Sequence, residues 1–128
     1  MIAKGAHHVS LIVSDVERSR AFYGQLLGLE EIERPDFGIP GAWYDAGPIQ
    51  LHLIVPPQGM KRVEPSLSPI APHTAFEIED YADVCEALRK NGLDLLETGA
   101  AVGQIFVNDP DGNLIELIAP GGRLGRRR

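Results

Sequence analysis

Cysteine, tryptophan and long apolar runs are nearly absent from this sequence of 128 residues, which has one Cys, one Trp and 6% aromatic residues. The single Cys85 excludes a disulfide within the chain and is typical of a reducing compartment. No apolar run approaches the ~20 residues of a membrane-spanning helix, and the N-terminal residues lack the apolar segment of a signal peptide. We therefore expect a small soluble cytoplasmic domain with no membrane partner.

An excess of basic charge is absent as well. The chain has 12 Lys and Arg against 18 Asp and Glu, a formal net charge of −6, which argues against binding to nucleic acid or to anionic membranes. Hydrophobic residues make up 44% of the chain and charged residues 23%, as in ordinary globular proteins. The length fits one compact domain or two small modules that share a core.

The same order of elements is predicted twice along the chain. The first half reads as a strand, a helix capped by Asp15 and three strands, over residues 7–13, 16–27, 29–32, 42–45 and 49–55. The second half repeats this order over residues 73–78, 81–90, 93–97, 104–108 and 114–118. Residues 56–72 hold five of the ten prolines and read as a linker. The predicted fold class is therefore α+β with two tandem βαβββ modules, residues 1–55 and 73–120, followed by a flexible Arg-rich tail over residues 121–128.

Matching residues in the two halves lie at a nearly constant spacing of 64 or 65 positions. Five pairs share this spacing: His8 and His73, Asp15 and Asp80, Gly28 and Gly92, Asp45 and Asp109, and His52 and Glu116. A constant spacing between like elements indicates two copies of one supersecondary unit. Each half is too short to bury a large core alone, so we expect the two copies to pair.

Four residues at repeat-equivalent positions are predicted metal ligands: His8 and His73 at one position, and His52 and Glu116 at the other. An ionised Glu in an apolar strand is costly unless a positive charge compensates it. Imidazole and carboxylate ligands together suit one divalent ion of Zn, Fe, Ni, Co or Mn per site. A lone His in a strand is more often a core or surface residue, and a lone Glu more often faces solvent, but chance does not pair four such residues. His7 has no counterpart and reads as a neighbour of the ligands.

Candidate substrate contacts follow from strand alternation, because residues two positions apart in a strand share a face. Ser10 and Gln50 share the face of the two first-half ligands in this way. Trp43, Gln104 and Phe106 are further candidates for the rim of the site, although the aromatic residues also fit a plain core role. These five residues are the predicted substrate-binding set for a small, partly apolar molecule.

Three segments carry a resemblance to a known family: His8-Val-Ser-Leu-Ile-Val-Ser-Asp15, Phe22-Tyr23 before Leu27-Gly28-Leu29, and Asp109-Pro-Asp-Gly-Asn-Leu-Ile-Glu-Leu117. They resemble the vicinal oxygen chelate superfamily, which includes glyoxalase I, extradiol dioxygenases and the fosfomycin- and bleomycin-resistance proteins. The resemblance covers residues 6–119. It implies a glyoxalase-like fold, in which paired βαβββ modules form a cup-shaped mixed sheet around the metal, usually in a homodimer. The ligand positions of the family fall on His8, His52, His73 and Glu116.

The resemblance also implies an activity. Family members chelate a substrate through two neighbouring oxygens, and in glyoxalase-like members a metal-bound Glu moves a proton on carbon through an enediolate. Because Glu116 matches that Glu, the leading hypothesis is a metal-dependent lyase or isomerase in which Glu116 is both ligand and general base. The alternatives are an Fe(II) extradiol-type dioxygenase and a metal-independent module that binds a small molecule or an antibiotic.

Two departures from glyoxalase I proper bear on the substrate. That enzyme usually has Glu where this chain has His52, so three imidazoles and one carboxylate leave a divalent ion with a residual positive charge, which favours an anionic substrate. The Asn-Trp segment that binds glutathione in glyoxalase I is replaced by Val55-Pro56-Pro57. The substrate is expected to be a small molecule, and these departures argue against glutathione, although the sequence leaves open whether glutathione or another thiol is used.

Overall fold

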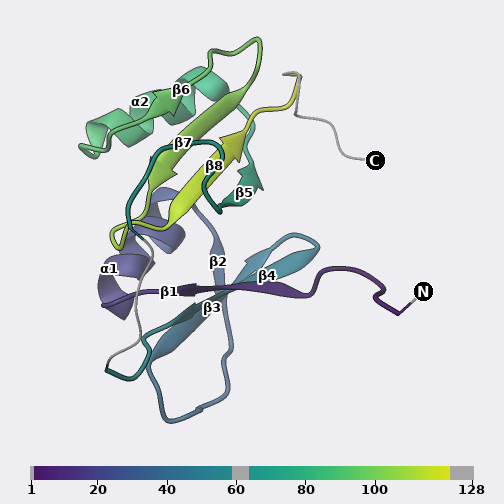
Figure 1. The fold of residues 1–128 in the computed structure, drawn as a ribbon, viewed down its shortest axis with the longest axis vertical. Helices are drawn as coiled ribbons and strands as arrows, with labels where there is room; N and C mark the ends of the chain where they lie inside the picture. The colour runs from purple at the N-terminus through teal and green to yellow at the C-terminus, as the bar shows by residue number, and fades with distance from the viewer. Residues whose placement is uncertain (1, 59–63, 122–128) are drawn as a thin grey trace. The chain divides into compact units, whose positions relative to one another are not determined.

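The chain divides into two compact units, Met1–Arg62 and Val63–Arg128, called here the N-terminal and C-terminal units. The structure is a computed structural model that describes residues 2–58 and 64–121. Residues 59–63 of the predicted linker and residues 122–128 of the predicted Arg-rich tail lie outside the described residues. Each unit has one helical region and one four-stranded sheet (Figure 1).

The sheet of the N-terminal unit is mixed, with the strand order β1-β4-β3-β2. Strands β1 and β4 are parallel, and the other two pairs are antiparallel. The elements are β1 (His8–Ile12), α1 (Val16–Arg20), the π-helical segment η1 (Ala21–Leu26), β2 (Glu30–Ile32), β3 (Gly41–Ala46) and β4 (Ile49–Ile54). In this register Ser10 of β1 and Trp43 of β3 both pair with His52 of β4. His52 therefore lies in the middle of a strand that is hydrogen-bonded on both sides.

The C-terminal unit repeats this topology with the strand order β5-β8-β7-β6. Strands β5 and β8 are parallel, and β7 pairs antiparallel with both β6 and β8. The elements are β5 (Thr74–Glu77), α2 (Tyr81–Lys90), β6 (Leu96–Glu97), β7 (Gln104–Asn108) and β8 (Leu114–Ile118). Phe106 pairs with Glu116 as Trp43 pairs with His52. The shared topology confirms the predicted α+β class with two βαβββ modules.

Both helices start at the predicted Asp caps, but the first helix differs from the prediction in its second half. Asp15 Oδ1 accepts from the backbone N–H of Glu17 at 2.9 Å, and Asp80 Oδ1 accepts from that of Asp83 at 2.9 Å. The predicted helix over 16–27 is α-helical only to Arg20 and then widens into η1, where the N–H of Leu27 donates to the carbonyl of Phe22, five residues back. This wider turn buries the two adjacent rings of Phe22 and Tyr23 together.

Five predicted strands are shorter than expected, and two of these differences lie in the C-terminal unit. The strand predicted over 93–97 is confined to Leu96–Glu97. The strand predicted over 73–78 begins at Thr74, so His73 precedes it rather than lying within it. The imidazole of His73 is instead fixed by its own loop, because its Nδ1 lies 2.7 Å from the carbonyl oxygen of Ala71.

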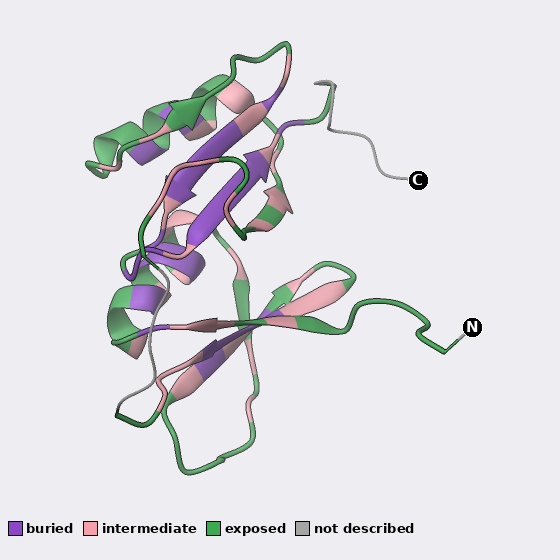
Figure 2. Ribbon diagram, viewed as in Figure 1, coloured by how far each residue is buried: buried purple, intermediate pink, exposed green. Residues whose placement is uncertain are grey.

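The core of the C-terminal unit lies between α2 and its two central strands. Figure 2 shows β7 and β8 mostly buried, whereas the edge strands β5 and β6 are intermediate or exposed. Helix α2 buries Leu88 and the free thiol of Cys85, and this burial raises the pKa of Cys85. None of the helices in the described ranges combines the length and apolar character needed to cross a bilayer.

The turn between β7 and β8 is closed by side chains of the turn itself and by the end of the predicted linker. Asp109 Oδ1 accepts from the backbone N–H groups of Asp111 at 2.9 Å and Asn113 at 2.8 Å, and Gly112 has a φ of +87°. Pro65 lies over Gly112, so that a Cβ at residue 112 would meet Pro65 Cγ at 2.7 Å. Pro65 thus packs against this turn of its own unit.

Candidate functional site

The two predicted ligands of the N-terminal unit are in direct contact. His8 of β1 and His52 of β4 stack with their ring centroids 4.1 Å apart and their planes at 16°. The parallel pairing of β1 and β4 produces this contact, since His8 pairs with Gln50, two residues before His52 on the same face. His8 is exposed and His52 is buried, with 6% of its surface accessible. The unit therefore presents one outer and one inner imidazole.

Two of the predicted substrate contacts enclose the inner imidazole. The indole of Trp43 stacks on the second face of His52 at 3.9 Å, with the two planes 3° apart. Gln50 Oε1 lies 2.9 Å from His52 Nε2, within hydrogen-bonding distance. His52 is thus held on both ring faces and at one nitrogen, which fixes its orientation in the way that partners of metal-binding histidines do. Ser10, also predicted to contact substrate, is exposed on β1 opposite His52.

Burial and positive neighbours favour the neutral form of His52. Desolvation is the largest cause that lowers its pKa from the ordinary value of 6.5, followed by the charges of His8, His7 and Arg34. A neutral imidazole keeps a lone pair for a metal ion. Close to this pair, His7 Nδ1 lies 2.8 Å from His8 Nδ1, so the residue read as a mere neighbour contacts a predicted ligand directly.

The two predicted ligands of the C-terminal unit are also in contact. His73 Nε2 lies 2.9 Å from Glu116 Oε1, and Glu116 is buried, with 5% of its surface accessible. Gln104 Nε2 donates to the second carboxylate oxygen, Oε2, at 2.9 Å. Phe106 packs edge-on against the His73 ring at 5.6 Å. Gln104 and Phe106, both predicted to contact substrate, therefore surround the ligand pair.

The chemistry of this second pair calls for a cation. Because the carbonyl of Ala71 accepts a hydrogen bond, His73 Nδ1 carries a proton. In a neutral ring, Nε2 then has a lone pair that faces the carboxylate oxygen of Glu116, and two such atoms repel each other at 2.9 Å. A proton shared between the two atoms, or a metal ion bound by both, removes this repulsion. Two donor atoms at right angles around an ion at about 2.1 Å are about 3.0 Å apart, so the residues fit a metal.

The four predicted ligands thus form two pairs, one in each unit. Within the residues that the structure describes, no group of three or more His, Cys, Asp and Glu side chains is placed to hold a metal ion. Each pair has an aromatic residue across the ladder, Trp43 or Phe106, and a glutamine on one of its polar atoms, Gln50 or Gln104. The aromatic residues thus occupy equivalent places in the two units, whereas the glutamines come from different strands, Gln50 from β4 and Gln104 from β7.

A cavity of about 340 Å³ opens beside the histidine pair of the N-terminal unit. Its lining combines polar side chains with apolar ones, namely His7, Asp45 and Gln50 with Ile32, Pro48 and Ile49. Two of these residues contact the predicted ligands, since His7 lies against His8 and Gln50 against His52. The volume lies at the lower end of the range typical of small-molecule sites.

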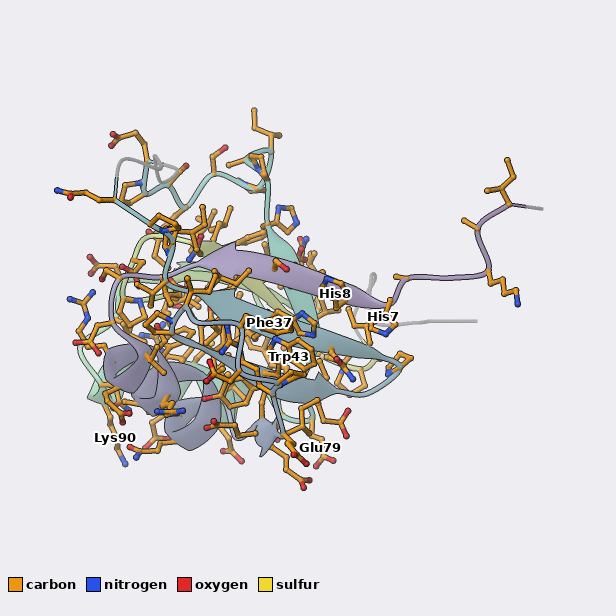
Figure 3. The ribbon with its side chains drawn as sticks, turned by 90° about the horizontal axis from the view of Figure 1, so that it is seen from below. His7, His8, Phe37, Trp43, Glu79 and Lys90 are labelled. Carbon is orange, nitrogen blue, oxygen red and sulfur yellow. The ribbon has the colours of Figure 1, made fainter. Side chains whose placement is uncertain are left out.

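The structure adds a residue that the sequence reasoning did not select. Phe37, in the loop between β2 and β3, lies 6.0 Å from the Trp43 ring. Figure 3 labels both rings, and Phe37 reaches the predicted ligands only through Trp43, which stacks on His52. The sequence held one signal for Phe37: it is an aromatic residue in a loop that also contains Pro and Gly, and loops often carry binding residues.

Comparisons with known proteins agree on one family. The model of the Glyoxalase/Bleomycin resistance protein/Dioxygenase superfamily matches residues 5–117. The chain is 33% identical over 118 residues to Glyoxylase I 4 of Arabidopsis thaliana, covering 87% of this chain and 68% of that protein. It is 32% identical over 120 residues to lactoylglutathione lyase of Salmonella typhimurium, covering 87% of this chain and 89% of the relative.

A solved structure shares the fold at lower identity. A fosfomycin resistance protein from Listeria monocytogenes, crystallised with Mn(II) and a dihydroxypropylphosphonic acid, superimposes with a TM-score of 0.74. The match has 22% sequence identity and covers 97% of this chain and 95% of that chain.

Proposed function

The chain belongs to the Glyoxalase/Bleomycin resistance protein/Dioxygenase superfamily, and on that premise we propose that it is a metal-dependent lyase or isomerase of the glyoxalase type. Its substrate is a small molecule that presents two neighbouring oxygens. The names of the curated relatives, Glyoxylase I 4 and lactoylglutathione lyase, support this class of reaction. His8, His52, His73 and Glu116 bind one divalent transition metal, and Glu116 is also the general base.

The His73–Glu116 contact carries the proposal. Its two facing electron-rich atoms, 2.9 Å apart, fit a metal ion or a proton between them, and the hydrogen bond from His73 to Ala71 directs Nε2 toward Glu116. The histidine pair of the N-terminal unit supplies donors of matching type, one of them held neutral by burial. Imidazole and carboxylate donors in this ratio suit Zn, Fe, Ni, Co or Mn.

Each residue has a separate task in the proposed reaction. The bound metal supplies Lewis acidity that stabilises negative charge on the substrate oxygens. As general base, Glu116 would use Oε1, freed from the metal, to take a proton from one substrate carbon and deliver it to the neighbouring carbon, while Gln104 donates a hydrogen bond to Oε2. Trp43 and Gln50 keep the His52 imidazole in one orientation. Three neutral imidazoles and one carboxylate leave positive charge at the centre, which favours an anionic substrate.

Metal content is the decisive measurement. Protein purified without a His tag is loaded with Zn, Mn, Ni, Co or Fe(II), dialysed and analysed for metals, alongside Glu116→Gln and the control Glu79→Gln, an exposed carboxylate in the same unit. We expect one tightly held ion per chain, an affinity loss of at least about 10-fold in Glu116→Gln, and no change in the control. Iron with turnover of a catechol favours the dioxygenase instead. Absence of metal from the loaded wild type rejects the proposal and leaves a binding module.

A mixing experiment identifies the chains that form one site. We propose that the protein works as a homodimer, and the two ligand pairs can then meet within one chain or across two. One double variant lacks the first pair (His8→Ala, His52→Ala) and another lacks the second (His73→Ala, Glu116→Ala). Metal binding that returns when the two variants are refolded together assigns the site to two chains, whereas mixtures without binding assign it to one.

A further inference from the structure

The loop between β2 and β3 exposes apolar side chains beside the candidate site. Phe37 is 58% exposed and Ile39 is 36% exposed, and they are two of the five exposed large hydrophobic residues in the described part of the chain. The others, such as Ile70, lie on other segments. Scattered apolar residues on a surface are ordinary, but two on one loop are informative when one of them contacts Trp43, the ring that stacks on the predicted ligand His52.

Side-chain and backbone contacts hold Phe37 in a defined position. Arg34 Nη2 donates to the carbonyl oxygen of Ile39 at 3.0 Å, and its guanidinium carbon lies 5.2 Å from the centre of the Phe37 ring. The backbone N–H of Gly38 donates to Asp36 Oδ1 at 2.9 Å, which closes the turn at the tip. The exposed phenyl ring is therefore preorganised, a property that lowers the entropic cost of binding a ligand.

An unbroken series of ring contacts joins Phe37 to the predicted ligands. Phe37 lies 6.0 Å from Trp43 at 40°, Trp43 stacks on His52 at 3.9 Å, and His52 stacks on His8 at 4.1 Å. Trp43 therefore lies between Phe37 and His52, and a molecule held by its oxygens at His52 reaches Phe37 with a group that extends past the edge of the Trp43 ring.

We propose that the substrate carries a flat aromatic group next to its two oxygens and that this group stacks on Phe37 beside Trp43. The inference rests on the proposed function and names the substrate class of the same site. Aromatic rings prefer such offset or tilted partners. A second protein chain fits the patch less well, because a Phe and an Ile offer far less than the roughly 800 Å² per partner of a standard interface.

Lactate and mandelate are the probes, because both have a carboxylate beside a hydroxyl and differ in a methyl against a phenyl group. Dissociation constants are measured by calorimetry and by the fluorescence of Trp43, the single tryptophan, on the metal-loaded protein. We expect mandelate to bind the wild type about 10-fold more tightly than lactate. In Phe37→Ala this preference falls below about 3-fold while the lactate constant is unchanged. The control Ile70→Ala, an exposed apolar residue of the C-terminal unit, keeps the full preference.

The outcomes separate the inference from the proposed function. Equal affinities for the two acids in the wild type, or equal weakening of both in Phe37→Ala, overturn the aromatic substrate class and leave the proposed function standing. Metal retained without binding of either acid also overturns the aromatic class. Loss of metal from the wild type overturns the proposed function itself. A change in the mass of Phe37→Ala in sedimentation shows that Phe37 contacts another chain, which overturns the inference as well.

Discussion

Replacing Gln104 with Glu tests how closely the structure fixes the Glu116 carboxylate. Gln104 Nε2 donates to Glu116 Oε2 at 2.9 Å, and the isosteric Glu replaces this donor with a second carboxylate oxygen. Two like unit charges at that separation repel by about 5.7 kcal/mol at an effective dielectric constant of about 20 and by about 1.4 kcal/mol at about 80. Because the pair is partly buried and side chains can rotate apart, we expect a loss of unfolding free energy of about 2–4 kcal/mol for Gln104→Glu.

The control variant is Gln104→Ala, which removes the hydrogen bond without adding charge and is expected to cost about 1 kcal/mol. Urea unfolding of both variants and the wild type, followed by circular dichroism, gives the difference. Addition of the divalent ion that the wild type binds should restore most of the loss in Gln104→Glu and little in Gln104→Ala, since an ion neutralises the repulsion. A Gln104→Glu protein as stable as Gln104→Ala without metal would refute the reasoning, because the two carboxylates would then not be held together.

Two further predictions concern stability. Folding lowers the pKa of His52 from its ordinary value of 6.5. As the pH falls, the unfolded chain therefore protonates its imidazole before the folded chain does. The contribution of His52 to the free energy of unfolding is complete above pH 6.5 and is lost as the pH falls through the pKa of the folded state. Urea unfolding between about pH 8 and about pH 5 should show a steeper decline in the wild type than in His52→Asn, and parallel curves contradict this. Gly112→Ala should cost about 2–4 kcal/mol, because φ is +87° and Pro65 occupies the space of a Cβ. The control Gly99→Ala has a φ of +85° and open space around its Cβ, and it should cost about 1 kcal/mol of unfolding free energy. Both variants are measured by urea unfolding, and equal losses in Gly112→Ala and Gly99→Ala would show that the Pro65 contact has no effect.

The repeat was the part of the sequence that predicted most about the site. Residues spaced by 64 positions, such as His52 and Glu116, occupy the same place in the central strands β4 and β8. Duplicated modules place like residues in like registers, so a spacing in the sequence becomes a position in each sheet. The contacts of each pair, His8 with His52 and His73 with Glu116, follow from the parallel strands that close each module.

Other features depend on packing that a local pattern does not encode. The π-helical turn spans six residues, too few for the period of the apolar residues to distinguish it from an α-helix. The Phe37 loop has no periodicity, and the position of its ring depends on Arg34 and on the carbonyl of Ile39. His73 was expected within a strand, but its imidazole is oriented by the Ala71 carbonyl just before β5. Such contacts are set by the folded chain as a whole.

The placement of His52 and Glu116 in central strands has a consequence for how such a protein can diversify. Both residues lie on the central strands β4 and β8, which are hydrogen-bonded on two sides. A substitution that distorts either strand therefore also disturbs its two neighbours. Phe37 lies on a loop outside the sheets, where insertions and substitutions are tolerated. Substitutions in the loop can therefore accumulate while the side chains of His52 and Glu116 keep their places. Changes in this loop can therefore alter what surrounds Trp43 while the sheets that carry His52 and Glu116 stay intact.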